Sequence, residues 1–150
     1  MQIAWQGYNL TTENLMDWNM YFWAVVEWAE SRGYYVIVNG EDDCVDANEK
    51  IIEIDEKNTD IELRTYVILH EAGHVLVYNS PGDMKLLPGE MRNNKDLTKE
   101  QKVLVVEEEM EAWKRGKKLG RRLMIPINEE KWEKEKAQAI TNYMKWAIGE

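Results

Sequence analysis

The amino-acid sequence predicts a single α+β domain that is mostly helical, with a small sheet built from the middle of the chain. Long segments repeat apolar residues at three- and four-residue spacing, as amphipathic helices do, while short runs at 34–38 and 51–54 are rich in β-branched and aromatic residues. The chain has 150 residues, of which 44% are hydrophobic, and this suffices for one core over residues 1–150.

The first helix is expected to begin at Thr11 or Thr12, either of which can cap it, and to end at Gly33. The runs from Tyr34 to Val38 and from Ile51 to Ile54 are predicted strands, with room for another short strand near positions 44 and 45. The apolar residues of the first helix recur at helical spacing: Leu15, Trp18, Phe22, Val25, Trp28 and Ala29.

Two capping boxes predict where the next two helices begin. Thr59 with Glu62 opens a helix that runs to about Tyr78, and Thr98 with Gln101 opens another that runs to about position 124. A last helix is expected after position 128, and its expected core residues are Trp132, Ala139, Ile140, Tyr143 and Ala147.

The charge balance argues against a nucleic-acid partner. The formal net charge is -9, so the overall field of the protein would repel a phosphate backbone. Basic residues at 114–122 follow acidic residues at 107–111 on the same predicted helix, an order that suits the helix dipole. We therefore interpret the basic cluster as a solvated helix face, in which Glu111 can pair with Arg115.

The sequence carries no sign of a membrane or an oxidising compartment. Its apolar runs are too short to cross a bilayer, and the N-terminus lacks the pattern of a signal peptide. Cys44 is the single cysteine and cannot form an internal disulfide. We expect a cytoplasmic protein without a membrane partner, and the sequence does not determine its oligomeric state.

The segment from His70 to His74 reads HEAGH and matches the HExxH pattern inside a predicted helix. Four residues of helix rise about 6 Å and turn slightly more than once, so both imidazoles leave one face and can bind one ion. Glu71 is rotated by about 100° and can reach a water on that ion without being a ligand. The alternative is that both histidines have ordinary structural roles, but they are the two histidines of the chain and enclose the required glutamate.

A catalytic zinc site needs a third protein ligand, and with no further histidine available it must be a carboxylate. Among the glutamates at 107, 108, 109 and 111, helix geometry favours Glu109 first and Glu108 second. Glu111 has charged neighbours, while Glu107 and Glu108 have mixed ones, and a fully solvated acidic face is the alternative. The residues three and four positions from Glu109 are all apolar: Val105, Val106, Ala112 and Trp113.

These motifs resemble the ImmA/IrrE family of small intracellular metallopeptidases, which are related in plan to the gluzincins. The HExxH segment matches the first family motif, Glu109 to Ala112 the Glu-x-x-Ala motif, and Leu123 to Pro126 a Leu-Met-Pro-like end. The resemblance implies a zincin-like fold, Zn²⁺ as cofactor and Glu109 as the third ligand. Family members occur in phages and cut a transcriptional repressor, which implies a protein or peptide substrate.

The chain departs from the family pattern at Trp113, where members commonly place a small polar residue, so one polar group that would orient a ligand histidine is expected to be missing. The first functional hypothesis is a zinc endopeptidase with His70, His74 and Glu109 as ligands and Glu71 as general base and then acid. The second is a non-catalytic zinc-binding regulatory or interaction module. A tyrosine, an arginine or backbone amides would have to stabilise the transition state.

Overall fold

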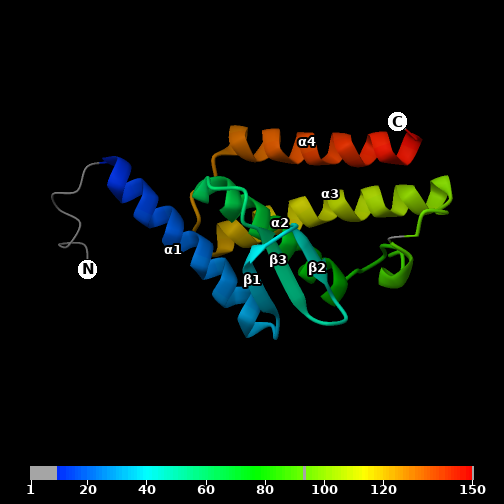
Figure 1. The fold of residues 1–150 in the computed structure, drawn as a ribbon, viewed down its shortest axis with the longest axis horizontal. Coiled ribbons are helices and arrows are strands. Elements are labelled where there is room, and N and C mark those ends of the chain that lie inside the picture. Colours follow the sequence, from blue (N-terminus) through cyan, green and yellow to red (C-terminus); the bar gives the residue numbers. More distant parts are fainter. Residues whose placement is uncertain (1–9, 93, 150) are drawn as a thin grey trace.

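The computed structural model describes residues 10–92 and 94–149, and for residues 10–17 the backbone alone. Within this part of the chain the predicted α+β class is confirmed, with long helices around a small mixed sheet (Figure 1). The elements in chain order are α1 (Leu10–Ser31), β1 (Tyr35–Gly40), β2 (Cys44–Asp46), β3 (Ile51–Asp55), α2 (Ile61–Asn79), the 3-10 turn η2 (Gly89–Met91), α3 (Lys99–Arg122) and α4 (Glu129–Ile148).

The three strands form a sheet in the order β1-β3-β2, so β2 lies at one edge. β1 pairs with β3 in parallel, with Tyr35 opposite Ile51, and β2 pairs with β3 antiparallel, with Cys44 opposite Glu53. Alternate residues Ile52 and Ile54 of β3 are buried in the core that α1 and α2 share. Because β2 is last in the strand order, its outer backbone edge has no strand partner among the described residues.

Helices α2 and α3 make the closest helix contact of the fold. A Cβ atom at Gly73 would lie 1.9 Å from the carbonyl oxygen of Ala112, and one at Gly116 would lie 2.3 Å from that of Leu69. The absence of a side chain at both glycines therefore lets the two backbones touch, which explains why Gly73 stands inside the HExxH helix. Helix α4 runs alongside α3 on the far side from α1 (Figure 1).

Helix starts were predicted with mixed success. The capping box of Thr98 and Gln101 is confirmed, and the helix after position 128 is capped by the Asn128 side chain. The assignment of Thr59 was wrong, because the carboxylate of Asp60 accepts hydrogen bonds from the backbone N–H groups of Glu62 and Leu63 and is the cap instead.

The predicted start of the first helix was also wrong: the described part of α1 already includes Leu10, so Thr11 and Thr12 lie inside the helix and do not cap it. Its end agrees with the prediction, since Gly33 adopts a φ of +87° just beyond Ser31. The strands agree to within two residues, including the short one at 44–46.

Three of the six basic residues at 114–122 of α3 form ion pairs with acidic residues in the described part of the chain. Lys117 and Arg121 contact Glu129 of α4, and the predicted pair of Glu111 with Arg115 is confirmed at 2.9 Å. These ion pairs link α3 to the start of α4 and occupy much of the basic cluster. No helix in the described part of the chain combines the length and apolarity that crossing a membrane requires.

Candidate metal centre

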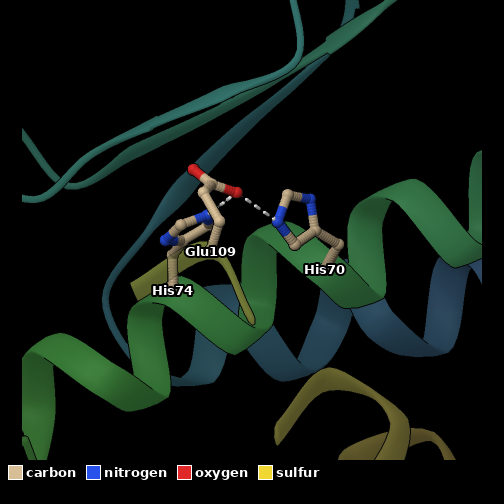
Figure 2. Close-up of side chains that lie close together, drawn as sticks. All are labelled: His70, His74 and Glu109. Atoms are coloured by element: carbon tan, nitrogen blue, oxygen red, sulfur yellow. Dashed lines mark hydrogen bonds and ion pairs between the residues drawn. The ribbon is translucent and has the colours of Figure 1, made fainter. Parts of the chain in front are cut away.

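His70 and His74 lie one turn apart on α2 and point their rings toward Glu109 of α3 (Figure 2). The Oε2 atom of Glu109 lies 2.9 Å from Nε2 of His70 and 3.2 Å from Nε2 of His74. One ligand atom from each of the three residues falls within 4.8 Å of the others. The three side chains selected from the sequence as metal ligands are therefore brought together at a single point.

Burial separates the four glutamates at 107–111 much as helix geometry predicts. Glu107 is exposed, and Glu111 is partly exposed and paired with Arg115. Glu109 is 2% exposed, on the side of α3 that faces the HExxH helix. Its carboxylate is the one that reaches both imidazoles, so Glu109 fits the third ligand position.

Glu108 is also 2% exposed, and it occupies a different position. Its Oε2 atom lies 2.8 Å from Nδ1 of His74 and accepts a hydrogen bond of 3.0 Å from the Tyr78 hydroxyl. Since the Nε2 atom of His74 faces Glu109, Glu108 binds the opposite ring nitrogen. A carboxylate at this place fixes the ring and its tautomer so that Nε2 stays free to bind a metal.

Arg92 joins the two buried carboxylates. Its Nη2 atom donates to Oε1 of Glu109 at 2.8 Å, and its Nη1 atom donates to Oε2 of Glu108 and to the Tyr78 hydroxyl. Because Arg92 binds Oε1, the other oxygen of Glu109 is left facing the histidines. Arg92 was not selected from the sequence, since it lies in an irregular segment without periodicity; the one available signal was that two buried carboxylates need a cationic partner.

Trp113 follows Ala112 on α3, and its ring stacks on the ring of His70. The ring centroids are 4.3 Å apart with an interplanar angle of 11°. On the other nitrogen of the same imidazole, Nδ1 lies 3.3 Å from Oε1 of Glu71. His70 is thus positioned by an aromatic plane and its own neighbour in sequence, in contrast to His74, which is held by Glu108.

The carboxylates make this cluster attractive to positive charge. Burial opposes protonation of His70, but Glu71 and Glu109 outweigh it and raise its pKa. Burial likewise opposes protonation of His74, yet Glu109 and Glu108 raise its pKa to about 10. Burial favours the neutral acid form of Glu109, but the two imidazoles dominate and lower its pKa far below the ordinary value.

The cluster opens into a cleft of about 1000 Å³. The lining of the cleft includes Glu71, which is 4% exposed, residues 43–48 on and beside β2, and Tyr143 of α4. Tyr143 was assigned to the core from its helical spacing; it is half-buried and lies close enough to Glu109 that burial and this carboxylate raise its pKa. The phenol therefore keeps its proton and shares it with Glu109 in a hydrogen bond at the side of the cleft.

The donor set suits a metal ion that accepts nitrogen ligands. Two imidazole nitrogens and one carboxylate oxygen are the ligands of many catalytic zinc sites, whereas calcium and magnesium prefer oxygen ligands. His74 and Glu109 are buried and His70 exposes 12% of its side chain, so the three ligand atoms are within the protein but at the bottom of an accessible cleft. The residues present could hold a metal ion here.

Comparisons with protein-family models, with curated proteins and with solved structures find no match to this chain. The assignment of the site therefore depends on the HExxH motif, on the convergence of His70, His74 and Glu109, and on the groups that orient them.

Proposed function

We propose that the chain is a zinc-dependent endopeptidase of the HExxH type, similar in plan to the ImmA/IrrE metallopeptidases. His70, His74 and Glu109 would hold the ion. The observation that carries the proposal is the convergence of these three side chains at the bottom of a cleft that also contains Glu71. In this structure the two imidazoles and the Glu109 carboxylate contact one another, and a divalent ion between them would bind all three in place of those contacts.

Glu71 would move the proton during hydrolysis. A zinc ion in the site supplies a Lewis acid that lowers the pKa of water toward about 7 and polarises a carbonyl group. The Glu71 carboxylate takes the proton from the attacking water and delivers it to the leaving nitrogen of the peptide. Its position supports this role, because it lines the cleft beside His70 without belonging to the ligand triad.

The edge of the sheet supports a peptide as the substrate. β2 is at the edge of the sheet, and residues 43–48 on and beside it line the cleft. An extended peptide can add to such an edge by main-chain hydrogen bonds, which bind a backbone of any sequence and keep the scissile bond extended. The substrate would then be an unfolded segment or an exposed loop of a protein.

Tyr143 is the best placed group to stabilise the transition state. Tyr66 donates its hydroxyl proton to Glu62 and Tyr78 donates to Glu108, so both hydroxyls are committed within the fold. Tyr143 lies in the cleft and carries a protonated phenol, and its hydrogen-bond partner is Glu109, the carboxylate that an ion in the site would engage. It would donate a hydrogen bond to the carbonyl oxygen as negative charge develops there.

The variant Glu71→Gln tests the proposal. The amide keeps the shape of the side chain but cannot accept a proton from water at neutral pH, so hydrolysis of an unstructured protein substrate should stop while zinc content stays at the parental level. Glu107→Gln is the matched control, because Glu107 is an exposed glutamate on α3, outside the cleft lining, and should leave both quantities unchanged. If Glu71→Gln hydrolyses substrate as fast as the parent, the assigned mechanism is wrong.

A further inference from the structure

The walls of the cleft carry carboxylates that the proposed chemistry does not use. They come from separate parts of the chain, the β2 side, the η2 turn and helix α4. Within residues 10–92 and 94–149 no ion pair joins any of them to a lysine or arginine. These wall carboxylates are Asp43, Asp46, Glu90 and Glu135.

The charges at the bottom of the cleft nearly cancel once a divalent ion is present. Glu71, Glu108 and Glu109 contribute three negative charges, and Arg92 with a divalent cation contributes three positive ones. Arg92 is the one lysine or arginine in the cleft lining, and it already binds Glu108 and Glu109. The net charge of the cleft is therefore set by the wall carboxylates and is negative.

Hydrogen bonds hold two of the wall carboxylates in place. Oδ1 of Asp43 accepts from the Asp55 backbone N–H at 2.7 Å, and Oδ1 of Asp46 accepts from the backbone N–H groups of Asn48 and Glu49 at 3.0 Å. These bonds use one oxygen of each side chain, so the second oxygen can bind a ligand. Both residues lie beside the strand edge on which a peptide would add.

The pKa of Cys44, which lies between these two aspartates in the sequence, responds to the same negative charges. Burial raises the pKa of its thiol, and the carboxylates of Glu53, Glu71, Asp42 and Asp43 add to this effect and bring it to about 11. Cys44 and Glu71, the residue proposed to carry the proton, both line the cleft. A positive side chain that enters beside β2 would therefore lie near the scissile bond.

We infer that the cleft selects peptides that carry lysine or arginine next to the scissile bond, an inference that rests on the proposed endopeptidase function. Wall carboxylates from separate sides of a cleft with low-dielectric walls attract basic peptides and repel acidic ones. Such charges change the association rate and its salt dependence more than the chemical step. The preference for basic peptides should therefore appear as a difference in kcat/KM, and this difference should decrease as salt is added.

A peptide series with one varied position tests the inference. Three peptides of identical sequence carry Lys, Gln or Glu beside the cleavage site, and kcat/KM is measured for each with the zinc-loaded protein at low and physiological salt. The parent should prefer the Lys peptide to the Glu peptide by at least about tenfold at low salt, the lower end of the range for electrostatic steering. The triple variant Asp43→Asn, Glu90→Gln, Glu135→Gln should reduce this preference several-fold and leave the Gln peptide nearly unchanged.

The control is a triple variant with the same change in net charge outside the cleft: Glu27→Gln, Glu107→Gln, Glu130→Gln. All three of these glutamates are exposed, lie outside the cleft lining and have no ion pair in the described part of the chain, so the Lys preference should be retained. Equal kcat/KM for the Lys and Glu peptides with the parent, or a parental preference in the cleft variant, would overturn the inference.

Failure of the proposed function is distinguished by a binding measurement. If the zinc-loaded parent cleaves none of the peptides, the endopeptidase proposal fails, and the affinities of labelled Lys and Glu peptides are then compared by fluorescence anisotropy. Tighter binding of the Lys peptide that is lost in the cleft variant supports the charge selectivity of the cleft. Equal affinities overturn it.

Discussion

The Nδ1 atom of His74 lies 2.8 Å from Oε2 of Glu108, a carboxylate that is buried directly beside the proposed ligand Glu109. This pair places the two neighbouring glutamates of α3 in different roles, one on each nitrogen of the same imidazole. Glu108→Ala should lower zinc affinity by about 10- to 100-fold, the usual effect of removing a group that orients a ligand histidine. Competitive zinc titration measures it. A loss larger than that of Glu109→Ala would show that Glu108, and not Glu109, binds the ion.

Gly73→Ala should destabilise the fold. The added Cβ would lie 1.9 Å from the carbonyl oxygen of Ala112, so α2 and α3 would have to move apart. Overpacking of this kind costs about 1–3 kcal/mol in the free energy of unfolding, and a clash with backbone belongs at the upper end or beyond it. Urea unfolding of the zinc-free protein measures the loss without a contribution from the ion.

Gly89→Ala is the control for Gly73→Ala. A Cβ at Gly89 would meet nothing within 4 Å, and its backbone does not have a positive φ, so the free energy of unfolding should stay within about 0.5 kcal/mol of the parental value. If both variants unfold at the parental urea concentration, the two helix backbones are not in contact as described.

Tyr143→Phe should lower kcat and change zinc affinity far less than Glu109→Ala does. The variant removes the hydroxyl proposed to bind the developing negative charge, and loss of one such donor typically lowers kcat by about 10²- to 10³-fold. Tyr35→Phe is the control, because Tyr35 is 69% exposed on β1 and lies outside the cleft lining. A Tyr143→Phe enzyme with parental kcat and raised KM would assign this residue to substrate binding instead.

The sequence was sufficient to predict side-chain positions that depend on the geometry of one helix. The spacing of His70 and His74 predicts a shared face, and the apolar neighbours of Glu109 predict that its side chain points inward; the structure shows both. The same neighbour test ranked Glu108 as mixed because Glu111 lies three residues away. Glu108 is nevertheless buried, since His74 and Tyr78 of α2 and Arg92 of the preceding segment all bind it.

Features that depend on two elements could not be predicted from local pattern. The parallel pairing of β1 with β3 skips β2 in the sequence, and the role of Arg92 follows from how the segment after α2 brings its guanidinium to Glu108 and Glu109 of α3. Competing caps were also ambiguous, because Thr59 and Asp60 are both good N-cap residues and only the backbone decides between them. Tyr143 fits a helical core pattern, and its exposure to the cleft depends on where α4 packs.

Zinc binding by the parent and by Glu109→Ala tests the central claim most directly. Competitive titration of the metal-free protein should give one zinc ion per chain for the parent, since two imidazoles and a carboxylate suit a four-coordinate ion with one open position. The zinc affinity of Glu109→Ala should fall by more than about 100-fold, which is the upper end of the effect of removing a group that only orients a ligand. Glu107→Ala changes an exposed neighbour and should retain the parental zinc affinity. A parent that takes up no zinc, or a Glu109→Ala variant that binds it as tightly as the parent, would contradict the account.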